Sequence, residues 1–326
     1  MLLWQMRRAL WRSFRSRHAL RRVQDRTGAI QRGHILGVMV VRNEALRLRH
    51  FLDWHRGLGV DHFLVVDNAS TDGSAEILAQ ASDVSLWTTD APYRDARFGL
   101  DWASWLLMRY GAGHWCLTLD ADELFLYAHH DTRDLHALTT WLEAQGRGAM
   151  GALMLDLYPE GPLGADCPET DPIKALSGFD AGPYRAQRQA PVRNLWVQGG
   201  ARERMFFAHA PEHSPTLNKL PLIKWRRYYA YVNSTHAALP SRLNMAYSGP
   251  GGPEPSGVLL HTKFLPDVVP RAEEDRARQQ HFHDPTRFAP YYDAIAARPT
   301  LWHAETRQFD GWQQLESLGL MQNGGW

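Results

Sequence analysis

Cysteine is scarce in this sequence: its 326 residues include two, Cys116 and Cys167. Two cysteines exclude a disulfide scaffold and a cysteine-rich zinc site. Cys116 lies in an apolar run, so we expect it to be a buried strand residue. Long apolar stretches are missing as well: Ile35–Val41 falls far short of the roughly 20 residues that a membrane-spanning helix needs. Because no apolar core follows the first basic residues, no signal peptide is predicted.

Two common phosphate-binding motifs are also missing. No Gly-x-Gly-x-x-Gly follows the first apolar run, and the chain contains no P-loop sequence. These absences disfavour dinucleotide-dependent dehydrogenases and P-loop kinases. If the protein binds phosphate groups, we expect a metal ion rather than a glycine-rich loop to hold them.

Charge is small overall but unevenly distributed. The formal net charge is +1, yet residues 1–32 hold nine arginines and a single acid, Asp25, so the remainder is acidic. We therefore expect no nucleic-acid partner. Because leucine, tryptophan and phenylalanine are interspersed with the arginines, residues 1–30 could contact an anionic membrane, or could form a solvated basic helix. We expect a cytoplasmic protein, peripheral on the inner membrane under the first alternative.

From residue 33 onward, short apolar runs alternate with amphipathic stretches, which is typical of an α/β protein with a Rossmann-like, mostly parallel sheet. The pattern predicts strands at 35–41, 62–66, 84–87, 115–119 and 149–157, and helices at 44–58, 98–109 and 135–143. It then predicts an irregular loop over 159–193, strands at 204–207, 220–225 and 258–264, and helices at 271–280 and 291–297.

Polar residues follow three of these strands, in the segments 42–44, 67–73 and 120–123. Ligands of open parallel sheets bind at the carboxyl ends of strands, where these segments would meet. In an extended backbone Asp120 and Asp122 point to the same side, so they could share Mn²⁺ or Mg²⁺. Such a metal can neutralise a diphosphate leaving group. The alternative is a solvated turn with helix-capping acids.

These segments and three later ones resemble the bacterial family-2-like glycosyltransferases of the GT-A fold. The matching stretches are Val41–Glu44, Gly59–Ser74, Trp115–Glu123, Gly199–Arg202, Lys219–Leu222 and Leu259–Phe264. The resemblance implies a GT-A-type domain over 33–265, with a basic N-terminal arm (1–32) before it and a helical C-terminal extension (266–326) after it.

The resemblance also implies roles for individual residues. A nucleotide-sugar, expected to be a UDP-sugar, would contact Arg42, Asn43, Glu44, Asp67, Asn68, Ser70, Asp72, Asp120 and Lys263. The metal would be held by Asp120 and Asp122 of the Asp-x-Asp motif, with His261 completing its shell, although a lone strand histidine can equally be a core residue. Arg202, Arg204 and Lys219 are further candidates for contacts with the diphosphate or for structural ion pairs.

A base must take the proton from the acceptor hydroxyl if transfer inverts the sugar. The acidic dipeptide motif that often supplies it in this family is missing, which leaves Asp156, Glu160 and Glu203 as candidates, with Asp156 preferred. The predicted function is metal-dependent sugar transfer to a glycan or lipid-linked acceptor in bacterial surface or exported polysaccharide synthesis. The alternatives are a sugar-nucleotidyltransferase and a catalytically inactive binding protein.

Overall fold

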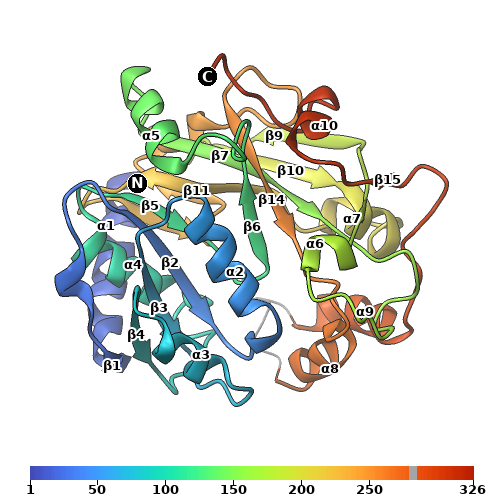
Figure 1. The fold of residues 1–326 in the computed structure, drawn as a ribbon, viewed down its shortest axis with the longest axis horizontal. Coiled ribbons are helices and arrows are strands. Elements are labelled where there is room, and N and C mark those ends of the chain that lie inside the picture. Colours follow the sequence, from blue (N-terminus) through green and yellow to red (C-terminus); the bar gives the residue numbers. More distant parts are fainter. Residues whose placement is uncertain (279–284) are drawn as a thin grey trace.

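The computed structural model describes residues 1–278 and 285–326, and a nine-stranded sheet forms its centre (Figure 1). In spatial order its strands are β1 (Arg21–Gln24), β4 (Val84–Thr88), β3 (His62–Asp67), β2 (Ile35–Val41), β5 (Trp115–Thr118), β11 (Asn218–Lys224), β7 (Ala149–Asp156), β14 (Ser256–His261) and β6 (Glu123–Leu126). Strands β4, β3, β2, β5, β7 and β14 run in one direction, and β1, β11 and β6 run in the other. The predicted α/β class with a mostly parallel sheet is confirmed.

In the part of the chain that the structure describes, three pairs of strands lie outside the central sheet. They are β9 (Tyr184–Arg188) with β10 (Leu195–Gly199), β12 (Ala230–Asn233) with β13 (Ala237–Leu239), and β8 (Gly178–Phe179) with β15 (Arg307–Gln308). The helices are α1 (Leu2–Ser16), α2 (Ala45–Gly57), α3 (Ser74–Gln80), α4 (Leu100–Leu106), α5 (Leu135–Ala144), α6 (Pro172–Ala175), α7 (Gly200–Phe206), α8 (Val268–Arg278), α9 (Pro285–Ala296) and α10 (Trp312–Ser317).

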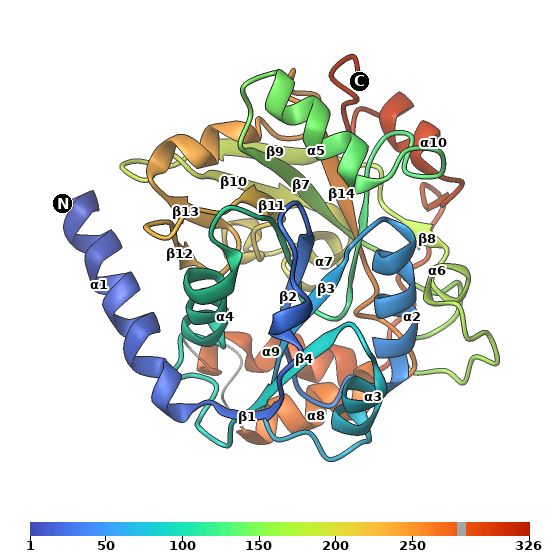
Figure 2. The same ribbon diagram turned by 60° about the vertical axis from the view of Figure 1, so that its left-hand side comes forward.

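Both faces of the inner strands are buried, which explains why β2, β3 and β5 read as continuous apolar runs, whereas the edge strand β1 is exposed. On β2, Ile35 and Met39 belong to the core cluster that includes α2, whereas Leu36 and Val38 belong to the cluster that includes α4. Figure 2 shows α2 and α3 on one side of β2 and β3, and α4 with α1 on the other. Cys116 is buried in β5, as predicted.

The N-terminal segment is attached to the sheet in two ways. Helix α1 packs against α4, and β1 pairs antiparallel with β4 at the edge of the sheet (Figure 2). None of the helices in the described residues combines the length and apolar character that crossing a bilayer requires.

One predicted strand is wrong. Residues 204–207 lie at the end of helix α7 and just beyond it rather than in a strand. Gly199 and Gly200, with φ of +136° and +70°, end β10 and turn the chain directly into α7. A short apolar run does not distinguish a strand from a buried helical segment. The helix predicted over 271–280 corresponds to α8 as far as residue 278, and residues 279 and 280 lie outside the described residues.

Candidate functional site

The polar ends of the strands meet at one edge of the sheet. Strand β2 lies between β3 and β5, so the segments that follow these three strands are neighbours, as the sequence predicted. Strands β7 and β14 are also parallel neighbours, and their last residues, Asp156 and His261, are register partners. The sheet therefore brings Asp156 and His261 to the edge that carries Asp120 and Asp122.

The predicted extended geometry of Asp120-Ala121-Asp122 is wrong, because these residues form a turn. The Glu123 amide donates to the carbonyl oxygen of Asp120 at 3.1 Å, and Glu123 begins β6. A turn is needed here because β6 runs opposite to β5. Asp120 and Asp122 consequently have different partners.

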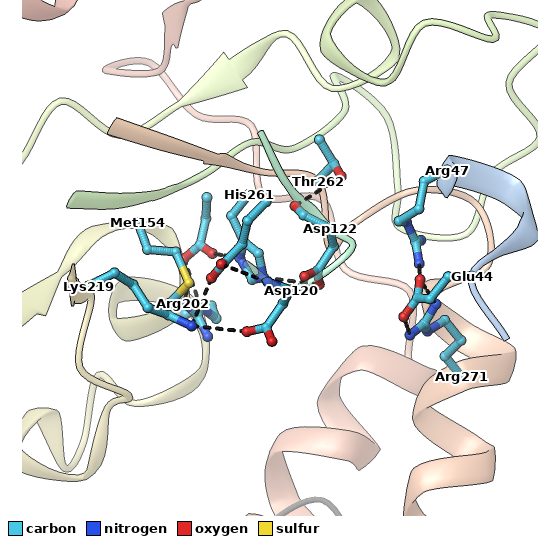
Figure 3. A network of polar contacts seen from close by, with 12 residues as sticks. Glu44, Arg47, Asp120, Asp122, Met154, Arg202, Lys219, His261, Thr262 and Arg271 are labelled. Atoms are coloured by element: carbon cyan, nitrogen blue, oxygen red, sulfur yellow. Dashed lines mark hydrogen bonds and ion pairs between the residues drawn. The ribbon is translucent and has the colours of Figure 1, made fainter. Parts of the chain in front are cut away.

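Asp122 faces His261 (Figure 3). The Oδ2 atom of Asp122 lies 3.1 Å from Nε2 of His261, and the other ring nitrogen, Nδ1, lies 2.6 Å from Oδ1 of Asp156. Arg202 Nε donates to Oδ2 of Asp156 at 2.8 Å. The four side chains form a continuous chain of contacts, Arg202–Asp156–His261–Asp122, which the sequence did not predict because its members come from four separate elements.

Opposite charges determine the protonation of this chain. Burial opposes ionisation of Asp122, but His261, Lys263 and Arg47 outweigh it and hold the pKa of Asp122 well below its usual range. Burial likewise opposes charge on His261, and the carboxylates of Asp122 and Asp156 raise its pKa. The pKa of Asp156 falls to about 2 despite its burial, because Arg202 and His261 stabilise the carboxylate. The two carboxylates therefore favour the protonated form of His261, and a metal ligated by Nε2 would have to displace that proton.

Asp120 points toward a different cation. Its Oδ2 accepts from Nζ of Lys219 at 2.9 Å (Figure 3). The same Nζ lies 2.9 Å from Oε1 of the buried Glu123. These two carboxylates raise the pKa of Lys219 against the effect of burial. Half of the Asp120 side chain, 56%, remains exposed. Lys219 thus has a structural ion pair, one of the two roles predicted for it.

Most of the predicted nucleotide-binding residues lie in the loops after β2 and β3, and hydrogen bonds connect these two loops. Arg42 donates through Nη1 to the carbonyl oxygen of Asn68 at 2.7 Å. The Asn43 amide donates to Oγ of Ser70 at 2.9 Å, and Asp72 Oδ2 accepts from the Ala45 amide at 2.9 Å. These bonds give the loops a defined shape.

Asp67 and Asn68 continue this structure. The buried Asp67 carboxylate accepts from the Ser70 amide at 3.3 Å, and Asn68 Nδ2 donates to the carbonyl oxygen of Thr89 at 3.0 Å. The structure places all seven predicted residues of these two loops close together, and their contacts with a nucleotide stay a prediction.

Glu44 has a partner that the sequence analysis missed. Arg271 of α8 donates through Nη2 to Oε1 of Glu44 at 2.6 Å, and Arg47 lies 2.5 Å from the other carboxylate oxygen (Figure 3). Arg47 also binds Asp267 at 2.7 Å, just before α8. These ion pairs connect the C-terminal segment to the loop after β2 and to the start of α2. Nothing in the local pattern around Arg271 pointed to this contact, because its partner lies 227 positions away.

The three candidate bases are in different environments. Both carboxylate oxygens of Asp156 are occupied by Arg202 and His261, and its side chain is 2% exposed, so it cannot readily take a proton from an acceptor. Glu203 is bound by Arg185 through two contacts of 2.6 and 2.7 Å. Glu160 is exposed in the turn after β7, and no ion pair to it is present in the described residues.

The Asp122–His261 pair fits a metal ion. Two adjacent ligands of an octahedral Mg²⁺, each at about 2.1 Å, lie about 3 Å apart, and the observed separation is 3.1 Å. A ligating histidine commonly donates its other ring N–H to a carboxylate, which Asp156 provides here. Within residues 1–278 and 285–326, no group of three or more His, Cys, Asp and Glu side chains is arranged to hold a metal. Water and substrate phosphates would have to complete the shell.

Comparisons with known proteins assign no family to this chain. No protein-family profile and no curated protein matches the sequence. The crystal structure of 4-diphosphocytidyl-2C-methyl-D-erythritol synthase is similar over 43% of this chain and 65% of its own length, slightly under two-thirds, with 17% identity and a TM-score of 0.27. A structure from Bacillus anthracis, described as a glucose-1-phosphate thymidylyltransferase in complex with a sucrose, is similar over 88% of this chain and 95% of its own, with 10% identity and a TM-score of 0.31. Similarity at this level supports no conclusion about function.

Proposed function

We propose that this protein is a metal-dependent glycosyltransferase that moves a sugar from a nucleotide-sugar, preferably a UDP-sugar, to a hydroxyl acceptor with inversion. The observation that carries the proposal is the Asp122–His261 pair. Asp156 binds the other ring nitrogen of His261, and Arg202 in turn binds Asp156. Buried ion pairs contribute little to stability on balance, so such a chain at the ligand-binding edge of a sheet favours a functional role.

Asp122 and His261 would hold Mn²⁺ or Mg²⁺, and Asp156 would keep the imidazole in the required orientation. When bound, the metal would neutralise the negative charge of the donor diphosphate. Lys263 is close enough to Asp122 to lower its pKa, and in the described residues no ion pair holds its ammonium group. We assign Lys263 to the diphosphate, and the loops after β2 and β3 to the nucleoside.

We assign the base to Glu160, because Asp156 and Glu203 are held in ion pairs. The acceptor would then lie beside the long loop that follows β7, at the start of which Glu160 is exposed. We place the reaction in the synthesis of bacterial surface or exported glycans, with a glycan or lipid-linked acceptor.

The test is release of UDP from a panel of UDP-sugars by the purified full chain, with Mn²⁺, with Mg²⁺ and with a chelator. We expect turnover that needs metal and falls at least about 100-fold in Asp122→Asn and His261→Asn, because each removes a metal ligand. Asp310→Asn and His18→Asn make the same chemical changes at exposed positions and should leave the rate unchanged.

Three outcomes would contradict the proposal. Failure of every nucleotide-sugar to bind would remove the donor site. Release of pyrophosphate from a nucleoside triphosphate and a sugar 1-phosphate would indicate a sugar-nucleotidyltransferase instead. Donor binding without turnover, even with glycan and lipid-linked acceptors added, would indicate a binding protein.

A further inference from the structure

Helix α1 attaches to the protein through its small and polar residues. Ala9 and Ser13 are its buried residues. Asp101 at the start of α4 accepts from Nε of Arg12 at 3.1 Å and lies 3.4 Å from Oγ of Ser13. A surface helix usually packs its large apolar side chains inward. In α1 this arrangement is reversed.

Several large apolar residues of α1 are exposed to solvent, whereas Leu2, Met6 and Leu10 are half-buried. The most exposed are Leu3 (68%), Trp4 (64%) and Trp11 (59%), and Phe14 is 38% exposed. Positions 3, 4, 11 and 14 fall on one side of a helix, opposite Ala9 and Ser13. Figure 2 shows α1 along the outside of the molecule, with α4 on its inner side. Leu3, Trp4 and Trp11 therefore form an outward apolar face, and Phe14 lies at its margin, where its ring also contacts Trp105 of α4.

Arginines occupy the same face. Arg7, Arg8 and Arg15 are exposed, and the Arg8 guanidinium lies 5.3 Å from the centre of the Trp4 ring. No acidic residue precedes Asp25 in the sequence, so the helix carries no negative side chain that could neutralise them. The outward face thus combines tryptophan, other apolar side chains and uncompensated positive charge.

We propose that this outward face binds the headgroup region of an anionic lipid bilayer. Tryptophan and leucine would enter the boundary between headgroups and acyl chains, and the arginines would contact the lipid phosphates. A second copy of the chain is a poorer occupant, because pairing two such faces would bring six exposed arginines together without a carboxylate on either helix. Lipid binding through α1 does not depend on the donor chemistry proposed above.

Binding of the full chain to lipid vesicles tests whether the outward face of α1 contacts an anionic bilayer. Vesicles that mix phosphatidylglycerol with phosphatidylcholine should bind the protein, whereas pure phosphatidylcholine vesicles should not. Each basic residue near such a surface contributes about fivefold to partitioning, so Arg7→Glu/Arg8→Glu should weaken binding by at least about 25-fold. Lys174→Glu/Arg307→Glu makes the same charge change at exposed positions outside α1 and should bind as the wild type does.

A second measurement reports on insertion. Brominated phosphatidylcholine in the anionic vesicles should quench tryptophan fluorescence, and Trp4→Phe/Trp11→Phe should remove most of that quenching while vesicle binding persists. The proposal is wrong if the wild type does not bind anionic vesicles. It is also wrong if Arg7→Glu/Arg8→Glu and Lys174→Glu/Arg307→Glu weaken vesicle binding equally. It is also wrong if sedimentation shows a dimer that Trp4→Ser/Trp11→Ser dissociates while vesicles bind neither form, because the face would then join two copies.

Discussion

Replacing Asp156 with alanine tests the central chain of contacts. The Asp156 side chain is 2% exposed and lies between Arg202 Nε at 2.8 Å and His261 Nδ1 at 2.6 Å. Its removal leaves the Arg202 guanidinium, itself 8% exposed, without a counterion. Removing one partner of a buried ion pair costs about 3–5 kcal/mol. For a chain of this size we expect the melting temperature to fall by about 1.5 °C per kcal/mol, or about 4–8 °C in total.

The assay is a double-mutant cycle on the free energy of unfolding, with Asp156→Ala, Arg202→Ala and the double variant. Arg202→Ala should cost less than Asp156→Ala, because His261 still neutralises the carboxylate. The double variant should cost less than the sum of the two by about 2 kcal/mol, which is the coupling energy of the pair. Arg185→Ala is the control: it breaks the Arg185–Glu203 pair, whose arginine is 53% exposed, and should cost less than about 1 kcal/mol.

Two results would refute this reasoning. A loss below about 1 kcal/mol in Asp156→Ala would mean that solvent reaches Arg202 and that the carboxylate is not needed to compensate a buried charge. Additive single variants would mean that Asp156 and Arg202 do not interact energetically, whatever their separation.

The other predictions concern pH, backbone strain and metal affinity. Burial lowers the pKa of His55 from 6.5 to about 3. As pH falls, His55 therefore takes up a proton in the unfolded chain before it does so in the folded protein. The free energy of unfolding should fall by about 1.4 kcal/mol per pH unit between pH 6.5 and 3. Urea unfolding at several pH values should show a shallower decline in His55→Gln, and equal slopes would contradict the assignment. An added Cβ at Gly199, where φ is +136°, would lie 2.2 Å from the Pro183 carbonyl oxygen, so Gly199→Ala should cost more than about 2 kcal/mol in chemical denaturation. Gly113→Ala, at φ +95° with open space around it, should cost about 1 kcal/mol, and a similar cost at both sites would rule out the steric explanation. Asp156→Asn should weaken Mn²⁺ binding in the presence of UDP by about 10–100-fold, measured by calorimetry, and unchanged affinity would show that Asp156 does not orient a ligand.

Local patterns were sufficient for much of the fold. Residues 35–41 form an uninterrupted apolar run because β2 is buried on both faces, and such a run is recognisable without the rest of the chain. The same reasoning located the polar segments after β2, β3 and β5, since consecutive parallel strands bring their carboxyl ends to one edge. Arg204–Phe207 shows the limit of this approach, because four residues do not distinguish a helix from a strand.

Local patterns in the chain were enough to identify the residues that end the strands, whereas strand order and register fix which of these residues are in contact. His261 lies 105 positions from Asp156 and 139 from Asp122, and these contacts exist because β14 pairs with β7 on one side and β6 on the other. The turn at Asp120 likewise follows from the place of β6 at the far edge of the sheet. The orientation of α1 depends on Asp101, which binds Arg12 and Ser13 and leaves the tryptophans outside. Periodicity is a local property of the chain, whereas a contact between distant residues depends on strand order and register, which no short window of sequence contains.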